Sequence, residues 1–304
     1  MAGVFGLEDM TLPVVAITVG DPSGIGPEIA VKALHDPRVT AVCRPVLYGP
    51  HSADAVASFP RAEVNAASGR AAYDAIVSAT TDALAGRVQA IATAPINKAA
   101  FAAAGLRWKG HTELLAHLCG VHDVAMMFWS DTLRVVLATV HIPLVHVARE
   151  LTTDRLLSVI TLTSSSLPRF GVSGPRLAVA GMNPHAGEDG LLGTEDRDVM
   201  TPAITMARAA GIDVSGPWPA DTIFVRAIRG EFDVVIAAYH DQGLVPVKLV
   251  AFGQAVNVTL GLPIIRTSVD HGTAFDIAGQ GVANAGSLVE AVLLAARLAV
   301  SSQP

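Results

Sequence analysis

The sequence predicts an α/β protein with a largely parallel sheet. Short runs of Val, Ile and Ala alternate along the chain with stretches of helical spacing. The short runs are continuously apolar, which is typical of strands buried on both faces. Strands that alternate with helices favour parallel pairing, because a parallel neighbour needs a crossover connection. At 304 residues the chain is long for a single core, so we expect two α/β domains.

Nine runs have the length and composition of strands, and each is too short for a typical helix. They lie at residues 14–19, 43–48, 88–93, 125–129, 134–140, 176–180, 233–238, 255–258 and 264–267. Helical spacing is clearest at residues 71–84, 153–166, 196–210 and 287–300. No linker rich in Pro or Ser divides the chain, so we expect discontinuous domains. The first would comprise residues 1–125 with 265–304, and the second residues 126–264.

Composition and charge exclude several function classes. The net charge is −6, and no run of Lys or Arg supplies the concentrated basic surface that nucleic-acid binding needs. No apolar run reaches the roughly 18 to 20 residues of a bilayer span. Residues 1–12 carry Glu8 and Asp9 and no basic segment, which argues against a signal peptide. Cys43 and Cys119 form no CxxC motif, so we expect buried thiols in a reducing, cytoplasmic compartment.

Three predicted strands are each followed by a histidine. His141 follows the run 134–140, His185 lies in a turn after 176–180, and His240 follows 233–238. Function in open α/β sheets collects at the carboxyl ends of strands. Three neutral imidazoles can hold a divalent metal and leave positions open for substrate oxygens. The alternative is that each histidine is structural or solvated, since their separations carry no local chelating signature.

Two segments have the local signals of anion binding. Gly20-Asp21-Pro22-Ser23-Gly24-Ile25-Gly26-Pro27-Glu28 follows a strand and opens a helix, where backbone N–H groups favour negative charge. It lacks the third glycine of the dinucleotide fingerprint, and a tight turn without a ligand is the alternative. Lys109-Gly110-His111-Thr112-Glu113 also opens a predicted helix, where His111 and Thr112 could donate to a phosphate.

Three further polar residues fall in apolar surroundings near the third histidine: Lys248, Asn257 and Arg266. A Lys or Arg in such a stretch must reach the surface, pair or bind an anion. Surface exposure for Lys248 and a structural ion pair for Arg266 are the alternatives. Their joint presence favours a bound phosphate or carboxylate. The segment Asp270-His271-Gly272-Thr273-Ala274-Phe275-Asp276-Ile277-Ala278-Gly279 is either a nucleotide-binding loop or a compact turn.

Taken together, these strings resemble the 4-hydroxythreonine-4-phosphate dehydrogenase family, and more widely the isocitrate and isopropylmalate dehydrogenases. The resemblance covers nearly the whole chain. Its most specific pieces are Gly110-His111-Thr112-Glu113, Asn183-Pro184-His185-Ala186-Gly187-Glu188, Gly216-Pro217-Trp218-Pro219-Ala220-Asp221-Thr222, Tyr239-His240-Asp241-Gln242-Gly243, and the stretch from Val256 to Thr273.

The resemblance implies an isocitrate/isopropylmalate dehydrogenase-like fold with the active site in the cleft between two domains. It implies NAD or NADP as cofactor and one divalent ion, Zn, Mg or Co, in each active site of a homodimer. The metal ligands would be His141, His185 and His240, one of them from the partner subunit. The second domain would carry these ligands and the dimer contacts. The implied substrate-binding residues are His111, Thr112, Lys248, Asn257 and Arg266. The implied nucleotide-binding residues are His271, Gly272, Thr273, Asp276 and Gly279.

The implied reaction is oxidation and then decarboxylation of 4-hydroxythreonine 4-phosphate (4-phosphooxy-L-threonine) to 3-amino-2-oxopropyl phosphate, in vitamin B6 biosynthesis. Lys248 would stabilise the charge that develops. Asp221 and Asp241 would accept protons or orient the histidines. Similar sequences act on threonate or erythronate 4-phosphate, or on a cis-dihydrodiol of terephthalate, and these remain alternatives. A non-catalytic binding protein is disfavoured, because the three histidines and the cationic set are all present.

Overall fold

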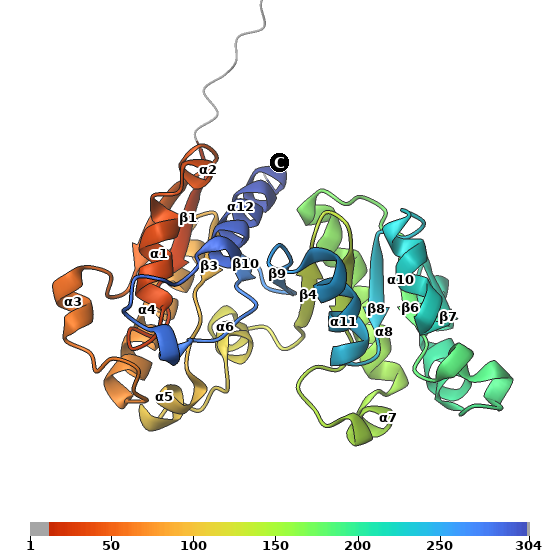
Figure 1. The fold of residues 1–304 in the computed structure, drawn as a ribbon. Coiled ribbons are helices and arrows are strands. Elements are labelled where there is room, and N and C mark those ends of the chain that lie inside the picture. The colour runs from red at the N-terminus through yellow and green to blue at the C-terminus, as the bar shows by residue number, and fades with distance from the viewer. Residues whose placement is uncertain (1–11, 303–304) are drawn as a thin grey trace, which may run out of the picture.

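The computed structural model describes residues 12–302, and its ten strands form one sheet (Figure 1). The strand order is β2-β1-β3-β10-β9-β4-β5-β8-β6-β7. The strands are β1 (Val14–Thr18), β2 (Arg44–Tyr48), β3 (Ala90–Thr93), β4 (Ala125–Trp129), β5 (Arg134–Leu137), β6 (Leu177–Ala180), β7 (Val214–Trp218), β8 (Val234–Ala237), β9 (Val256–Leu260) and β10 (Ile265–Ser268).

Two parallel blocks make up this sheet. Strands β2, β1, β3 and β10 are parallel to one another, and so are β5, β8, β6 and β7. Between the blocks, β9 and β4 pair with each other and with β10 and β5 in antiparallel fashion. The predicted α/β, largely parallel architecture is confirmed. The strands of the two expected domains are joined into one sheet, because the β9–β4 pair continues the hydrogen bonding across the expected boundary. The division into two domains at 125/126 and 264/265 remains a prediction.

Helices cover both faces of the sheet. They are α1 (Gly26–Leu34), α2 (Pro37–Thr40), α3 (Ala53–Ala57), α4 (Ala66–Leu84), α5 (Lys98–Ala103), α6 (His111–Cys119), α7 (Val147–Glu150), α8 (Thr153–Ser166), α9 (Thr201–Ala209), α10 (Ala220–Ile228), α11 (His240–Ala251) and α12 (Gly286–Ser301). Helix α8 has the predicted bounds, and its Thr152 side chain caps it by accepting the Arg155 N–H. Helix α12, at the end of the chain, packs beside the early strands β1 and β3 (Figure 1).

The two faces of the sheet are packed differently. One face forms a continuous core across all the central strands, with α1, α8, α9 and α12 against it. The other face has two separate cores, one under α4, α5 and α6 and one under α10 and α11. Side chains alternate between faces along a strand. Val256, Val258 and Leu260 of β9 therefore enter the continuous core, while Asn257 and Thr259 point to the opposite face. Polar groups thus gather on that face near the boundary between its two cores.

Strand β7 and the start of helix α9 differ most from the sequence prediction. Strand β7 was not predicted, because its sequence Val-Ser-Gly-Pro-Trp contains a glycine and a proline. Proline is tolerated in a strand at the edge of a sheet, where β7 lies. The predicted helix 196–210 begins instead with the π-helical turn Asp196–Met200 and continues as α9. Within residues 12–302, none of the helices combines the length and the apolar character needed to cross a bilayer.

Candidate active site

A cavity of about 470 Å³ collects residues from both halves of the sheet. Helices α5 and α6 contribute from one half, and the segment after β5 contributes from the other. Of the residues singled out from the sequence, seven line it: His111, Thr112, His141, Asn257, Arg266, His271 and Gly272. This cavity is therefore the candidate active site.

Arg266 of β10 is the strongest electrostatic feature of the cavity. The residue is 2% exposed, and its guanidinium donates to the hydroxyls of Thr259 at 3.0 Å and Thr93 at 2.8 Å, while Nε has no partner. None of the ion pairs within residues 12–302 involves it, so the structural ion pair considered from the sequence does not form. Burial lowers the pKa of Arg266 to about 9. A buried cation of this kind is stabilised by binding an anion.

Two neighbouring groups complete a site suited to phosphate. His111 is the first residue of α6, whose N-terminus has no side-chain cap. Burial, and next the charge of Arg266, hold the pKa of His111 well below its usual value, so the ring is neutral at neutral pH. His111 Nε2 and the Asn257 side-chain oxygen are buried without a hydrogen-bond partner. The unpaired His111 nitrogen, the uncapped helix N-terminus and the buried guanidinium form an anion-binding site. The Asn257 oxygen is an acceptor, so this residue would bind an anion only through the N–H₂ of its amide.

His141 and His240 lie together at one end of the sheet. They follow the neighbouring parallel strands β5 and β8, and their ring centroids are 5.7 Å apart. Burial lowers the pKa of His141, and the nearby Lys98 and His240 charges add to this effect. His240 Nδ1 contacts Asp241 Oδ1 at 2.7 Å, which leaves Nε2 free. A carboxylate on one nitrogen of a histidine orients the ring so that the other nitrogen can bind a metal, and His240 has this arrangement.

His185 does not join this pair within one chain. It follows β6, the next strand beyond β8, but lies in the turn Pro184–Gly190 with its side chain 61% exposed. Its Nδ1 contacts Glu188 Oε1 at 3.0 Å. Across residues 12–302, no cluster of three His, Cys, Asp or Glu side chains is placed to hold a metal ion. One chain therefore brings together two of the three predicted ligands.

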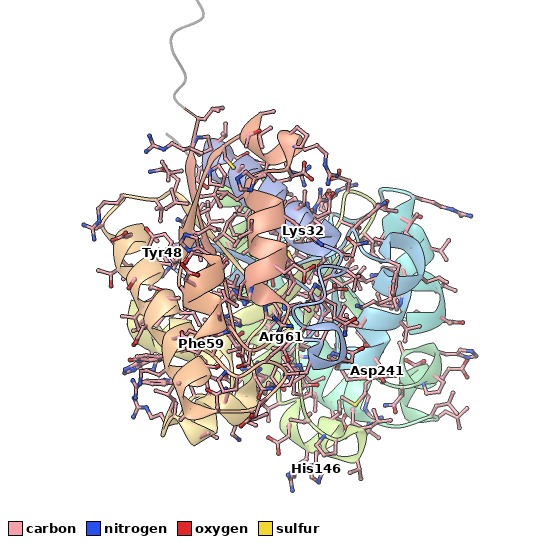
Figure 2. All side chains as sticks on the ribbon, turned by 60° about the vertical axis from the view of Figure 1, so that its left-hand side comes forward. Lys32, Tyr48, Phe59, Arg61, His146 and Asp241 are labelled. Carbon is pink, nitrogen blue, oxygen red and sulfur yellow. The ribbon has the colours of Figure 1, made fainter. Side chains whose placement is uncertain are left out.

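The three residues given catalytic roles lie outside the cavity lining. Lys248 forms an ion pair with Asp270, whose other oxygen accepts a hydrogen bond from Ser287. Asp221 is exposed in the first turn of α10. Asp241, with a side chain 80% exposed, lies at the protein surface (Figure 2) and contacts His240. Of the two roles considered for Asp241, the geometry favours orienting a histidine.

The predicted nucleotide loop is only partly at the cavity. His271 and Gly272 line it, while Asp276 is exposed beyond it. Gly279 has φ +68°, and a Cβ there would lie 2.4 Å from Arg61 Nε. Thr273 accepts a hydrogen bond from Ile25 N at 3.0 Å and so joins the loop to the glycine-rich segment.

The glycines at residues 20–28 approach the protein's own backbone. A Cβ on Gly20 would lie 2.2 Å from Pro95 O, one on Gly24 would lie 2.7 Å from Thr273 O, and one on Gly26 would lie 2.0 Å from Val19 O. None of these residues lines the cavity. The geometry therefore favours the tight turn over a direct anion cradle, and the turn fixes the position of the nucleotide loop.

Sequence reasoning missed two charged residues of the site, Lys98 and Arg155, which also line the cavity. Lys109 and Glu113, from the segment that the sequence marked for anion binding, line it as well, and Glu113 is the acidic residue facing the four cationic side chains. Arg155 Nε donates to Ala138 O at 3.0 Å, beside the segment that leads to His141. The local sequence around Lys98 and Arg155 gives no signal that they meet in one cavity, because their meeting depends on the order of the strands in the sheet.

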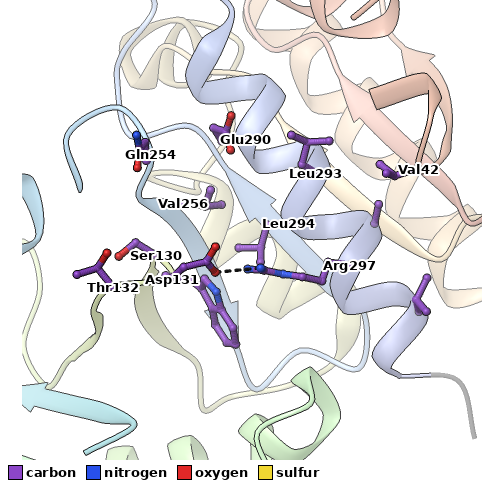
Figure 3. A pocket seen from close by; sticks show the side chains of 13 residues that line it. Val42, Ser130, Asp131, Thr132, Gln254, Val256, Glu290, Leu293, Leu294 and Arg297 are labelled. Carbon is purple, nitrogen blue, oxygen red and sulfur yellow. Dashed lines mark hydrogen bonds and ion pairs between the residues drawn. The ribbon is translucent and has the colours of Figure 1, made fainter. Parts of the chain in front are cut away.

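A second cavity, about 680 Å³, lies elsewhere (Figure 3). It is lined by the carboxyl end of β4 and by α12, whereas the candidate active site contains Val124 and Met126 at the start of β4. An ion pair between Asp131 and Arg297 spans part of it. None of the predicted site residues lies there, so its size alone does not make it the active site.

Comparisons with known proteins identify the family of this chain. The family model described as "Pyridoxal phosphate biosynthetic protein PdxA" matches residues 27–295. The 4-hydroxythreonine-4-phosphate dehydrogenase of Desulforapulum autotrophicum is 46% identical, over 93% of this chain and 95% of that protein. The D-threonate 4-phosphate dehydrogenase of Salmonella typhimurium is 45% identical, over 95% of this chain and all of that protein.

A solved structure shows the same architecture. The crystal structure of 4-hydroxythreonine-4-phosphate dehydrogenase from Klebsiella pneumoniae superposes with a TM-score of 0.88 and 39% identity, over 96% of this chain and 99% of that chain. The predicted α/β fold with a largely parallel sheet is thereby confirmed. The chain therefore belongs to the PdxA family of pyridoxal phosphate biosynthetic proteins and is a dehydrogenase that acts on a CH–OH group.

Proposed function

We propose that this enzyme catalyses the metal-dependent, NAD(P)-linked oxidation and decarboxylation of 4-hydroxythreonine 4-phosphate to 3-amino-2-oxopropyl phosphate, a step of vitamin B6 biosynthesis. The observation that carries the proposal is that one cavity holds the unpaired, buried Arg266 and also His141, which is paired with His240. Relatives that span nearly the whole chain are named for this substrate. The two free cysteines are in keeping with a cytoplasmic enzyme.

The phosphate end of the substrate would bind Arg266, with His111, Thr112 and Asn257 around it. Arg266 supplies the charge, and the N-terminus of α6 supplies backbone N–H groups. His111 is neutral, so it would donate one hydrogen bond to the phosphate without adding charge. Lys109, beside the helix start, adds a second cation to this end of the cavity. Binding at this end holds the reacting carbons toward the histidine pair.

The metal would be held by His141 and His240 of one subunit and by His185 of the partner subunit. Of the expected ions, Zn and Co fit the two converging imidazoles, whereas Mg prefers oxygen ligands. The exposed third imidazole, His185, is free to bind a metal held by another copy of the chain. Helix α11, which begins at His240, also exposes Val245 (65%), Leu249 (84%) and Phe252, just past its end (80%). Such an apolar stripe beside an incomplete site supports a homodimer.

The chain's own residues would then support two chemical steps, oxidation and decarboxylation. Hydride leaves C3 for the nicotinamide as the hydroxyl proton departs, and the C1–C2 bond then breaks to release CO₂ and leave an electron pair that is protonated at C2. A bound divalent ion would supply Lewis acidity at the oxygen on C3. Asp241 orients His240, and Arg155 is placed to bind the carboxylate near His141. Lys248 is held by Asp270, so a role at the reacting atoms requires this pair to open.

A panel of substrates tests the proposed reaction. The purified enzyme is given 4-hydroxythreonine 4-phosphate, D-threonate 4-phosphate or unphosphorylated 4-hydroxythreonine, and formation of reduced nicotinamide is followed by absorbance. We expect the highest kcat/KM with the first compound and at least about a hundredfold loss without phosphate, because Arg266 is then left unpaired. Equal rates with and without the phosphate would contradict the proposal.

D-threonate 4-phosphate is a second candidate substrate, supported by a specific observation. Four cationic side chains face one acidic residue in the cavity, and the sugar acid carries no ammonium group to offset its charges. Relatives named for this substrate are about as similar as those named for the amino acid. The ratio of the two kcat/KM values in the same panel separates these substrates. A terephthalate dihydrodiol lacks the phosphate that the Arg266 site fits.

Mixing two inactive variants tests the shared metal site. His141→Ala and His185→Ala each remove one ligand, so each homodimer should be inactive. In a mixed dimer one of the two sites would regain a full ligand set, and statistical mixing would restore about a quarter of wild-type activity. If His185 acts within its own chain, the mixture stays inactive.

A further inference from the structure

The turn that carries His185 has an unusual backbone. Six consecutive residues have positive φ: His185 (53°), Ala186 (55°), Gly187 (82°), Glu188 (40°), Asp189 (55°) and Gly190 (100°). Four of them are not glycine, and residues with a Cβ disfavour this left-handed conformation. A run of this kind persists only where surrounding contacts hold it, and such runs collect at functional sites.

Asp196 supplies those contacts from the turn Asp196–Met200 that precedes α9. Its carboxylate is 1% exposed and accepts hydrogen bonds from Met182 N at 2.8 Å, Asn183 N at 3.1 Å and Asn183 Nδ2 at 2.9 Å. Two of these donors are backbone N–H groups and the third is the Asn183 side-chain amide, and both residues directly precede the Pro184–Gly190 turn. Glu195, the residue before it, accepts a second hydrogen bond from the Asn183 amide at 2.8 Å. The entry to the run is thus fixed by adjacent carboxylates.

Gly181, which precedes the run, and Gly187, which lies within it, are both next to the Asp196 carboxylate. A Cβ on Gly181 would lie 2.9 Å from Asp196 Oδ1, and one on Gly187 would lie 3.3 Å from Asp196 Oδ2. Glycine at these two positions leaves room for the Asp196 side chain. At the outer end of the run, the Glu188 carboxylate contacts His185 Nδ1 at 3.0 Å and leaves Nε2 free. His185 therefore has an exposed side chain whose Nε2 is free to bind a group outside the chain.

We propose that Asp196 is a positioning residue for metal binding: it holds residues 185–189 in the left-handed turn, so that Glu188 can orient His185 toward a second copy of this chain. This inference rests on the proposed function, because it takes His185 as a metal ligand. Asp196 itself touches neither metal nor substrate. It acts by fixing the conformation of the turn. That conformation is strained, and the hydrogen bonds to the Asp196 carboxylate offset the strain.

The test compares Asp196→Asn with Asp198→Asn in the intact, metal-free protein. Asp198 is two residues away, with a half-exposed side chain paired to Arg197, and is a matched control. The probe is Co²⁺, whose dissociation constant is measured by equilibrium dialysis and whose visible absorption reports the ligand set. Asn keeps the size of Asp but turns an N–H₂ toward backbone N–H groups. We expect a 10- to 100-fold weaker Kd, roughly the range for an outer partner of a ligand, and no change for Asp198→Asn.

Hydrogen exchange supplies a second readout that does not depend on metal. In metal-free Asp196→Asn we expect faster exchange at residues 182–189, with α8 and α12 unchanged. Wild-type Co²⁺ affinity in Asp196→Asn would overturn the inference. Equal Co²⁺ affinity in the wild type and in His185→Ala would instead overturn the proposed metal site.

A second variant covers the case in which Asp196→Asn does not fold. Asn183→Asp sets a third carboxylate against Glu195 and Asp196 in a partly exposed turn and leaves the core untouched. We expect weaker Co²⁺ binding and faster exchange at residues 182–189, as for Asp196→Asn. Unchanged Co²⁺ affinity in a folded Asn183→Asp would count against the inference.

Discussion

Replacing Arg266 with Met separates binding from stability in this active site. Met is similar in length and carries no charge. The fall in the pKa of Arg266 from 12.5 to about 9 corresponds to about 5 kcal/mol by which the empty pocket disfavours the guanidinium. The substitution also removes two hydrogen bonds to Thr259 and Thr93, each contributing about 1 kcal/mol. We therefore expect ligand-free Arg266→Met to be more stable than the wild type, by about 2 to 3 kcal/mol.

Ligand binding should change in the opposite direction. Removing the charged partner of a buried phosphate costs about 2 to 5 kcal/mol, which is at least about a 30-fold rise in Kd. The assay is thermal and urea unfolding with and without inorganic phosphate, together with calorimetric titration of phosphate. Phosphate should stabilise the wild type and leave Arg266→Met unchanged. A variant that is less stable without ligand and still binds phosphate normally would refute the reasoning.

Arg169 offers a matched control. Its guanidinium donates to the backbone oxygens of Leu262 at 3.2 Å and Pro263 at 2.7 Å, in the loop that leads into β10. Its partners are neutral carbonyls of the protein, so its role is to hold the backbone. Arg169→Met should lose stability and keep the wild-type Kd for phosphate.

Two further predictions concern the same cavity. Because the folded-state pKa of His111 lies well below 6.5, acid protonates the unfolded chain first, so stability should fall below pH 6.5 by up to about 1.4 kcal/mol per pH unit. Urea unfolding at pH 5.5 and 7.5 should show a smaller difference for His111→Gln than for the wild type, and an unchanged difference would contradict this origin. Arg155→Gln should raise KM for the phosphorylated hydroxy acid about tenfold or more, as expected for a lost charge-assisted hydrogen bond, while the exposed Arg149→Gln should not. Equal KM values would remove Arg155 from the site.

Much of the fold could be predicted from the sequence, because buried parallel strands are continuous apolar runs. The strand at 125–129 and the helix at 153–166 have the predicted bounds. Strand β7 was not predicted because Gly216 and Pro217 are ordinary turn signals. An edge strand tolerates both residues. That the two parallel blocks share one sheet follows from the antiparallel β9–β4 pair, which apolar periodicity does not encode.

The site was predictable where local sequence carries the function, and not where distant segments meet. Arg266 stood out as a charge in an apolar run, and the structure places it unpaired in the cavity. The partnership of Lys248 with Asp270 depends on how α11 packs beside the end of β10, which no motif reveals. The proposed role of Asp196 likewise depends on a left-handed backbone that the sequence Asn-Pro-His-Ala-Gly-Glu does not predict.

The most direct test of the central claim is reduction of NAD(P) by 4-hydroxythreonine 4-phosphate, followed through removal and return of the metal. The account predicts turnover by the enzyme as purified, loss of turnover after dialysis against a strong chelator, and recovery when a divalent ion is added back. His141→Ala, which removes one ligand beside the cavity, should not recover. Sustained turnover in excess chelator would contradict the claim that these imidazoles serve the reaction through a bound metal.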